Sequence, residues 1–519
     1  MKKDHRPDRA AEQQRSLTLA FKRAELSVED LWLRYFGVGG EAGFIDIDAY
    51  VHGLADLPPL ERDTLALAVN ERLDELTWTH RAGFSRQIRD STPRTPPFTA
   101  LVQLLEGTEL APPDRLSAAV KTAAAALGVR IGVYLVDYDQ LCLRPLPDAP
   151  SGELSAKYPH PSSSEDQGET SHRAAPPGQP ASGRTALDVD TTLAGRAFRQ
   201  IQILPSETSG PPRLWVPLMD GAERLGVLDV EVDDADDLYD PGLRVQCRWL
   251  SMLLGHMVTL LSQYGDDLDR VRLRTRRTVN ADLVWSLLPP LTAGVDSFIV
   301  TGVVEPRDDV SGDAFDYALS ETTASLMVLD AVGHDLRSGL IAATAVSAYR
   351  SARRAGHGLF EQARLIDETI SGHFGDSAFA TAVLVELDLT TGRLRYINAG
   401  HPHPLVMRAG KIVKPLAAGR CLPLGLGLGD LQVGEETLEP EDWLVLYTDG
   451  VTEARDHTGE FFGEPRLRDF LRREAAAGNP PPETARRLTK AVLRHQNGTL
   501  QDDATVLLAR WTRPARMTP

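Results

Sequence analysis

The sequence predicts an α+β protein of several domains. Its 519 residues exceed the ~100 to 200 residues of an ordinary domain, which favours about three domains. Apolar residues recur at helical spacing between residues 17 and 90, on both sides of the breaker Pro58-Pro59. After Pro289 and Pro290 the pattern changes to strand-like segments. We therefore expect a helical N-terminal part and a C-terminal part built largely of strands.

The composition argues against several classes of function. Lys and Arg total 56 and Asp and Glu total 73, so the net charge is −17, and such a chain repels nucleic-acid phosphates unless its basic residues are segregated. No apolar signal region follows the charged N-terminus, and the apolar run at 251–262 is shorter than the ~20 residues that a bilayer requires. The three scattered cysteines have no CxxC spacing and indicate neither disulfides nor a zinc site. We expect a cytoplasmic protein with no nucleic-acid and no membrane partner.

Composition shifts divide the chain into four predicted parts. A helical module is expected over residues 1–100, and it ends in a Pro-rich break at 91–98. Residues 110–262 are expected to form a second domain, interrupted at 148–184 by an insertion rich in Pro, Ser and Gly that predicts disorder. A helical linker over 263–295 and a strand-rich domain over 296–512 complete the chain.

The second domain resembles a GAF sensory domain. A helix and a strand precede the insertion, and the hairpin WVPLMDGAERLGVLDV and a long helix from about Pro241 follow it. GAF domains are α/β sensors that bind cyclic nucleotides, bilins, haem or other small molecules, or nothing. The resemblance implies an unknown small-molecule ligand, because no Cys or His stands in an arrangement that would select one.

The helix that leaves this domain has the spacing of a coiled coil. Apolar residues alternate in steps of four and three, which predicts a parallel homodimer: Leu250, Leu254, Met257, Leu261, Tyr264, Leu268 and Val271. The seam then shifts phase to Val279, Leu283 and Leu287, a stutter that would unwind the coil locally. Alternatively, these residues pack the helix onto its own domain.

Acidic residues stand at the ends of the C-terminal strands. Two aspartates lie in SGDAFD, one closes the strand SLMVLD, one follows WLVLYT, and two precede ATVLLARW: Asp313 and Asp316, Asp330, Asp449, Asp502 and Asp503. Each alone reads as a turn or solvated-loop residue. Four aspartates from these four segments together predict an oxygen-ligand site for two hard cations, Mn²⁺ or Mg²⁺, since one carboxylate can bridge a pair of such ions.

The C-terminal part resembles the SpoIIE-like branch of the PPM (type-2C) protein phosphatases. The matching motifs, in chain order, are LLPPLT, SGDAFDY, VLDAVGHDLRSGL, NAGHPHPL, LPLGLG, VLYTDGVTEAR and QDDATVLL. The resemblance implies an α-β-β-α sandwich, in which Asp330 would bridge two metal ions and the carbonyl of Ala331 would be a further ligand. Asp313 would complete one ion, and Asp449 and Asp502 the other.

The resemblance also implies the reaction. The family hydrolyses phosphoserine and phosphothreonine with water activated by the two ions, without a phosphoenzyme. The implied substrate is a small regulatory protein, typically an anti-sigma-factor antagonist. One departure is Gly333-His334-Asp335, where the family usually has GHG, and it adds a carboxylate near the site. His334 would act as a general acid or fix its loop.

For three other polar residues of this part we expect a structural or solvent-exposed role and not a functional one. His401 and His403 look like zinc ligands, but in the family that stretch is a turn beside the core. Arg307 is read as a solvated loop residue, although a guanidinium could hold a phosphate. Two other functions remain open: a catalytically silent scaffold that reports ligand binding, and a nucleic-acid-binding regulator that uses the basic N-terminal helices. The first conflicts with the full set of aspartates, and the second lacks a recognition helix with a basic face.

Overall fold

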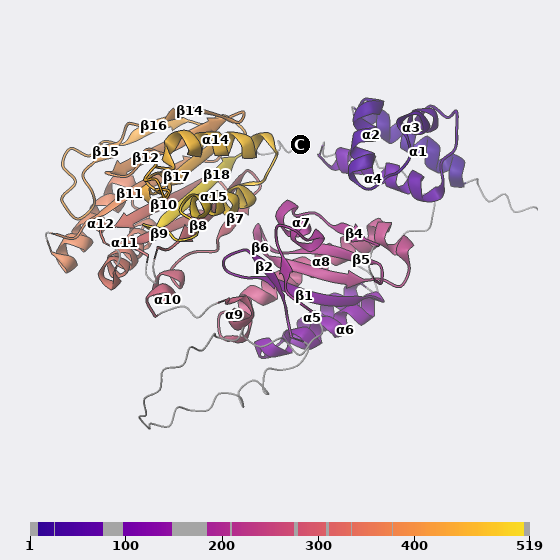
Figure 1. The fold of residues 1–519 in the computed structure, drawn as a ribbon, viewed down its shortest axis with the longest axis horizontal. Helices are drawn as coiled ribbons and strands as arrows, with labels where there is room; N and C mark the ends of the chain where they lie inside the picture. Colours follow the sequence, from indigo (N-terminus) through magenta and orange to yellow (C-terminus); the bar gives the residue numbers. More distant parts are fainter. Residues whose placement is uncertain are drawn as a thin grey trace, which may run out of the picture. The chain divides into compact units, whose positions relative to one another are not determined.

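The chain divides into two compact units. The computed structural model describes residues 9–24, 26–75, 97–147, 184–207, 210–274, 279–307, 311–333, 335–375 and 377–512. One unit comprises residues 1–136, 141–218 and 226–272, and the other comprises 137–140, 219–225 and 273–519 (Figure 1). Nearly all of the insertion predicted at 148–184, and His334, lie outside the described residues.

The described residues of the N-terminal part form four helices up to Glu75. These are α1 (Arg9–Arg23), α2 (Val28–Gly37), α3 (Phe44–Val51) and α4 (Pro59–Glu75). Ser27 starts α2 with a capping box, in which its hydroxyl accepts the Asp30 N–H and its own N–H donates to the Asp30 carboxylate. Leu17, Leu31 and Leu65 are buried in the core that these helices share.

The rest of the first unit is built on a six-stranded sheet of order β3-β2-β1-β6-β5-β4. Its elements are α5 (Pro97–Thr108), η1 (Pro113–Arg115), α6 (Leu116–Leu127), β1 (Arg130–Val136), β2 (Cys142–Pro145), β3 (Leu187–Asp188), α7 (Leu193–Gln200), β4 (Leu204–Ser206), β5 (Arg213–Asp220), β6 (Glu223–Glu231), η4 (Ala235–Tyr239), α8 (Pro241–Leu261) and α9 (Asp267–Arg272). The predicted hairpin forms β5 and β6. Because α5 packs on α6 and α8, this layer begins at Pro97 and not at residue 110. The GAF assignment stays a prediction.

The continuous coiled-coil helix predicted beyond residue 250 is wrong. Helix α8 ends at Leu261 and α9 begins only at Asp267. Leu250, Leu254 and Leu261 are each 1% exposed or less, because α8 packs them onto its own unit. The four-three spacing therefore reflects a helix buried on its own domain, which was the alternative interpretation. Over the described ranges, no helix is both long and apolar enough to span a bilayer.

The second unit contains, over its described residues, two sheets and six helices. Its elements are α10 (Val279–Trp285), β7 (Thr292–Val295), β8 (Phe298–Glu305), β9 (Asp313–Leu319), β10 (Thr323–Ala331), α11 (Leu336–Arg354), α12 (Leu359–Phe374), β11 (Ala380–Asp388), β12 (Arg393–Ala399), β13 (Leu405–Arg408), β14 (Lys411–Pro415), β15 (Arg420–Cys421), β16 (Gly434–Thr437), β17 (Trp443–Tyr447), α13 (Asp449–Thr452), α14 (Gly463–Ala476), α15 (Pro481–His495) and β18 (Ala504–Trp511). One sheet has the order β15-β12-β11-β10-β9, with β16 beside β12, and the other has the order β14-β13-β17-β18-β8-β7.

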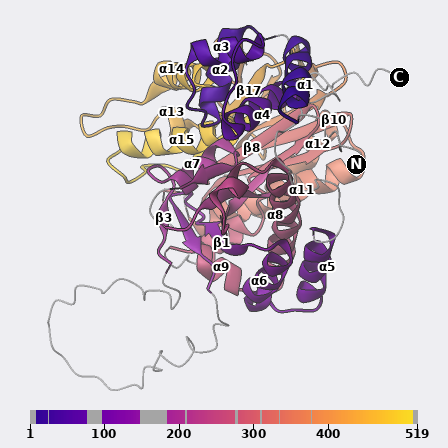
Figure 2. The same cartoon turned by 90° about the vertical axis from the view of Figure 1, so that its right-hand side faces the viewer.

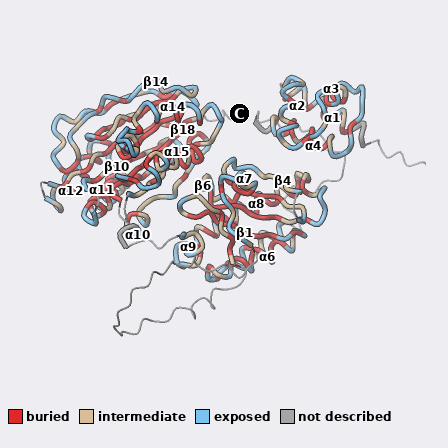
Figure 3. Tube along the Cα trace, viewed as in Figure 1, coloured by how far each residue is buried: buried red, intermediate tan, exposed pale blue. Residues whose placement is uncertain are grey.

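The predicted α-β-β-α sandwich is present in this unit (Figures 1 and 2). Side chains alternate along each strand, so Leu326 and Val328 of β10 lie in the core between the two sheets, while Met327 and Leu329 lie in the core under α11 and α12. A third core packs the second sheet against α14 and α15. Figure 3 shows the buried strands in red between helices whose outer faces are exposed.

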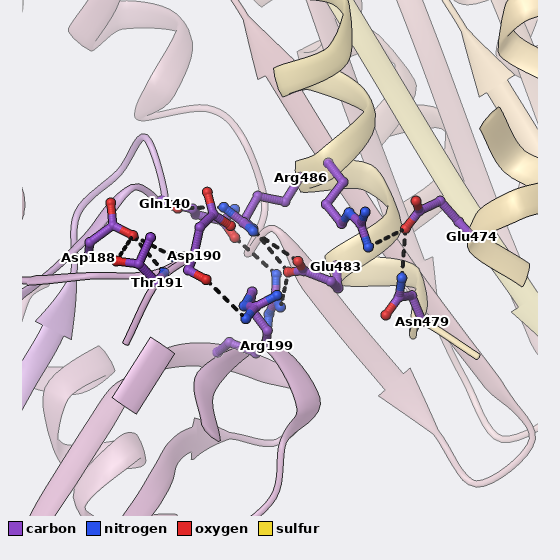
Figure 4. Close-up of polar contacts among 11 residues, drawn as sticks. Gln140, Asp188, Asp190, Thr191, Arg199, Glu474, Asn479, Glu483 and Arg486 are labelled. Atoms are coloured by element: carbon purple, nitrogen blue, oxygen red, sulfur yellow. Dashed lines mark hydrogen bonds and ion pairs between the residues drawn. The ribbon is translucent and has the colours of Figure 1, made fainter. Parts of the chain in front are cut away.

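Polar contacts hold the outer helices together. Glu474 of α14 is 4% exposed, and it accepts a hydrogen bond from Asn479 Nδ2 (2.8 Å) and pairs with Arg487 of α15 (3.2 Å). Within α15, Arg486 Nη2 pairs with Glu483 Oε1 at 2.9 Å (Figure 4). The three buried ions, Glu474, Glu483 and Arg486, are thus all paired, as ions with little access to water must be.

The segment before the sandwich is tied to it by backbone carbonyls. Arg350 of α11 donates to the carbonyl of Leu287 (2.7 Å), and Tyr317 Oη donates to the carbonyl of Pro290 (2.6 Å). Strand β7 pairs with β8 from Thr292 onward, so the sheet begins a few residues before the predicted boundary at 296. The LLPPLT motif is thus part of the phosphatase-like unit.

Candidate metal centre

Asp313 and Asp330 face each other at one end of the sandwich. They are paired residues in the antiparallel ladder of β9 and β10. Along a strand, every second side chain lies on the same face. Asp330 therefore shares a face with Leu326 and Val328, and Asp313 with Phe315, so both carboxylates are on the side of the sheet that faces the second sheet. The predicted bridging carboxylate and one predicted partner are therefore brought together.

The second sheet contributes the remaining acidic residues. Asp449 begins α13 directly after β17 and Thr448, and Asp502 precedes β18, which pairs with β17. The Thr448 hydroxyl donates to Asp313 Oδ2 at 2.8 Å. Asp449 and Asp502 therefore lie at the end of the second sheet that meets Asp313 and Asp330.

Asp503 lies where these segments meet. Its Oδ1 accepts the N–H of Arg307 at 2.8 Å, and its Oδ2 accepts the N–H of Gly312 at 2.7 Å. Only glycine fits at Gly450, because a Cβ there would overlap the carbonyl oxygen of Asp503. At Gly312 a Cβ would approach the carbonyl oxygen of Ala331 to 2.7 Å. These two glycines let the aspartate-bearing loops pack closely.

The cluster concentrates negative charge that is shielded from water. Burial, followed by the charges of Asp449, Asp502 and Asp503, raises the pKa of Asp330 to about 7. Burial and the charge of Asp330 raise the pKa of Asp313 well above its ordinary value, and the hydrogen bond from Thr448 opposes this rise. Burial and then Asp502 raise the pKa of Asp449. Buried carboxylates that repel one another in this way favour cations as partners.

The donor set fits Mn²⁺ or Mg²⁺. All the predicted side-chain ligands are carboxylates, which hard divalent cations prefer, and the Ala331 carbonyl lies at the end of β10 beside Asp330. Over the described residues, no three His, Cys, Asp or Glu side chains close around one point as a finished metal site. The carboxylates of Asp313, Asp330, Asp449 and Asp502 are thus grouped at one end of the sandwich without forming a closed shell.

Asp316 does not belong to this cluster. It lies three residues after Asp313 on β9, hence on the opposite face, where it is 1% exposed and contacts α11. Its carboxylate pairs with Arg350 at 2.6 Å and with Arg353 at 2.9 Å. Asp316 therefore holds α11 on the sheet.

Of the other polar residues singled out in the sequence, His401 and Asp335 have structural roles, and the side chain of Arg307 is at the surface. His401 is 4% exposed, its Nδ1 lies 2.7 Å from Thr381 Oγ1, and burial lowers its pKa to about 3, so the ring is neutral. Asp335 caps α11 by accepting the N–H groups of Arg337 and Ser338. The extra carboxylate after His334 thus starts a helix. Arg307 is exposed.

Two contributors were not recognised from the sequence. In the sequence, Thr448 stands only as one residue of the motif VLYTDG, and Asp503 only as the neighbour of Asp502. The alternation of side chains along a strand is a signal that could have found Thr448. Thr448 follows Leu444 and Leu446 in steps of two, and these leucines face the first sheet.

Comparison with known proteins identifies the class of this part of the chain. Residues 320–512 match the family described as Stage II sporulation protein E (SpoIIE). This part, with its sandwich and acidic cluster, is a SpoIIE-type PPM phosphatase domain. Asp330, Ala331, Asp449 and Asp502 lie within the matched residues, and Asp313 lies just before them.

Particular relatives share this part with the chain. Protein IcfG of Synechocystis sp. is 26% identical over 328 residues, which are 57% of this chain and 51% of IcfG. Phosphoserine phosphatase RsbP of Bacillus subtilis is 28% identical over 163 residues, 30% of this chain and 40% of RsbP. The chain thus spans about half of IcfG and less of RsbP. Among solved structures, the SiaA-PP2C domain of Pseudomonas aeruginosa has 24% identity and a TM-score of 0.39, and covers 44% of this chain and 94% of that domain.

Proposed function

We propose that this chain is a metal-dependent protein serine/threonine phosphatase that removes phosphate from a regulatory protein. The observation that carries the proposal is the ladder pair Asp313 and Asp330, with Asp449 and Asp502 at the same end of the sandwich. Aspartates with a purely structural role would not be expected to lie together, because their mutual repulsion raises the pKa of each carboxyl and costs stability. Bound cations would offset this repulsion, so a clustered arrangement favours a metal site.

In this proposal the aspartates hold two Mn²⁺ or Mg²⁺ ions. Asp330 would contact both ions, Asp313 would serve one, and Asp449 and Asp502 the other, with the Ala331 carbonyl as a further ligand. When bound, the ions supply an activated water near neutral pH and neutralise charge on the phosphoryl group. Thr448 orients Asp313 through the 2.8 Å hydrogen bond. Gly312 and Gly450 pack closely against the carbonyl oxygens of Ala331 and Asp503, beside the proposed ligands.

The proposed substrate is a phosphoserine or phosphothreonine of an anti-sigma-factor antagonist. The support is the similarity to RsbP and to RsbU of Bacillus subtilis, both of which are named phosphoserine phosphatases.

Residues 97–261 are proposed to regulate the enzyme as a GAF-like sensor for a small molecule that is not identified. Their antiparallel sheet, with helices α5, α6 and α8, supports this reading. We also propose a cytoplasmic homodimer. Because the coiled-coil prediction is wrong, its support is three exposed apolar side chains on α8 and the turn that follows, Met252, Leu260 and Tyr264. Exposed Arg248 and His256 lie on the same side of α8.

Hydrolysis of p-nitrophenyl phosphate by the full chain tests the proposal. Activity should appear with Mn²⁺ or Mg²⁺, vanish with EDTA and return when the ion is restored. A phosphorylated anti-sigma-factor antagonist from the same genome should then be a better substrate than an unrelated phosphoprotein. Turnover that resists the chelator would refute the metal centre. No turnover with any ion would favour the rival function, a silent scaffold that reports ligand binding.

A further inference from the structure

The side chain of Asp503 uses both of its oxygens on the backbone of the segment that leads to Asp313. Oδ1 accepts the Arg307 N–H at 2.8 Å, and Oδ2 accepts the Gly312 N–H at 2.7 Å. Asp503 is 5% exposed, so a carboxylate that is shielded from water accepts both N–H groups, and the loss of one of its oxygens would take this acceptor away from one donor. The carboxylate therefore fixes both ends of this segment to the start of β18.

The same residue is connected to the other predicted ligands. Gly312, which Asp503 holds, accepts the Ala331 N–H through its carbonyl at 3.0 Å. The Asp503 N–H donates to Asp502 Oδ1 at 3.0 Å, and its carbonyl packs against Gly450, next to Asp449. Asp503 thus contacts the segments next to Asp313, Asp449 and Asp502 directly, and it is connected to Ala331 through Gly312.

We infer that Asp503 is a positioning residue of the metal centre, which holds the ligands of the two sheets in one arrangement without contacting an ion itself. This inference rests on the proposed metal centre. Both of its oxygens are occupied by N–H groups, whereas Asp502 is exposed. We therefore assign Asp502 as the metal ligand of this pair, and Asp503 as the residue that holds the neighbouring backbone in position. Partners of this kind typically account for a 10- to 100-fold effect on metal affinity.

The test is Mn²⁺ binding by the metal-stripped full chain, measured by isothermal titration calorimetry. Asp503→Asn keeps the size of the side chain but replaces one acceptor oxygen by an amide. We expect Mn²⁺ to bind at least about tenfold more weakly. Amide hydrogen exchange of residues 311–313 should also become faster, because the Gly312 N–H or the Arg307 N–H loses its acceptor.

Asp442→Asn is the matched control. Asp442 is 0% exposed at the start of β17, and its carboxylate likewise accepts a backbone N–H, that of Glu439 at 2.7 Å, as well as pairing with Arg408. It should lower the melting temperature and leave Mn²⁺ affinity unchanged. If Asp503→Asn does not fold, Asp503→Glu keeps both oxygens and the charge but displaces them, and the same weakening is expected.

The outcomes separate this inference from the proposed function. Mn²⁺ affinity of Asp503→Asn within twofold of the wild type, or an equal loss in Asp442→Asn, overturns the positioning role. A wild-type chain that binds Mn²⁺ but hydrolyses no phosphate ester overturns the proposed function and leaves the positioning role in place.

Discussion

Thr448 donates its hydroxyl to Asp313 Oδ2 at 2.8 Å, and its oxygen accepts the N–H of Thr505 at 2.9 Å. The hydroxyl thus connects the second sheet, which holds Thr448 and Thr505, with a carboxylate of the first. Thr448→Val removes the donor and keeps the shape. We expect Mn²⁺-dependent kcat/KM to fall about tenfold, the loss of one hydrogen bond to a charged group.

Thr448→Ser is the control for that experiment, because it retains the hydroxyl. It should recover most of the activity on p-nitrophenyl phosphate. If Thr448→Val and Thr448→Ser are equally active, the hydrogen bond to Asp313 has no part in catalysis.

Asp330 and Asp316 should have opposite effects when each is changed to Asn. Asp330→Asn should lower kcat by at least about 100-fold, since the proposed bridging charge is lost, and should leave the free energy of unfolding unchanged or higher, because a repelled buried charge is removed. Asp316→Asn should lower the free energy of unfolding by about 3 kcal/mol, because Arg350 and Arg353 lose their partner.

Activity assays and urea unfolding of the two variants check this prediction. Asp316→Asn should keep its kcat at temperatures where it stays folded. Equal losses of activity in both variants would show that the metal centre has been misplaced.

Gly450→Ala should damage the site by steric overlap. A Cβ would collide with the carbonyl oxygen of Asp503, so we expect a loss of about 2 kcal/mol or more of stability together with weaker Mn²⁺ binding. Gly372→Ala is the comparison. Gly372 is an exposed residue of α12 with no atom within 4 Å of its added Cβ, and alanine there should stabilise the protein by about 0.5 to 1 kcal/mol. Thermal unfolding with and without Mn²⁺ distinguishes the two.

Metal binding should weaken in acid. The pKa of Asp330 is raised to about 7, so without metal this carboxyl is largely protonated below pH 7, and a cation must displace the proton. Apparent Mn²⁺ affinity should be about tenfold lower at pH 6 than at pH 8. A raised pKa also makes the metal-free fold less stable as pH rises from about 4 to 7. The increase in melting temperature caused by Mn²⁺ should therefore be larger at pH 8, and an increase independent of pH would contradict this.

Two leucines of α8 distinguish burial from association. Leu254 is 0% exposed, so Leu254→Lys should cost about 3 kcal/mol or more in the unfolding of the first unit. Leu260 is 49% exposed, and Leu260→Lys should leave stability nearly unchanged. If the exposed side of α8 joins two copies, Leu260→Lys should sediment as a monomer. A dimer that persists in this variant would place the contact elsewhere.

Much of the phosphatase part could be predicted because its signals are local. Apolar runs that end in aspartate are visible in the sequence, and the alternation of side chains along a strand separates Asp313 from Asp316 once the strand is known. The partner of each carboxylate could not be read in this way. That Asp503 binds backbone N–H groups depends on contacts between residues almost 200 positions apart, as the separation of 191 between Gly312 and Asp503 shows.

The coiled-coil prediction failed for a physical reason. Apolar residues spaced by four and three lie on one side of any α-helix, whether that side meets a second chain or its own domain. Burial of Leu250, Leu254 and Leu261 within one chain shows the second case. Only the position of α8 on its own sheet and helices, which is a tertiary property, decides between the two.

The acidic cluster is shared between two sheets whose facing side chains pack into one core. Asp313 and Asp330 belong to one sheet and Thr448 and Asp503 to the other, and between the sheets lie residues such as Phe315 and Leu507. A substitution that changes the thickness of this core will therefore alter the spacing of carboxylates far from it. Metal affinity should therefore respond to small changes in the distance between the two sheets. Conservative substitutions in the centre of the sandwich should abolish the proposed activity without unfolding the protein.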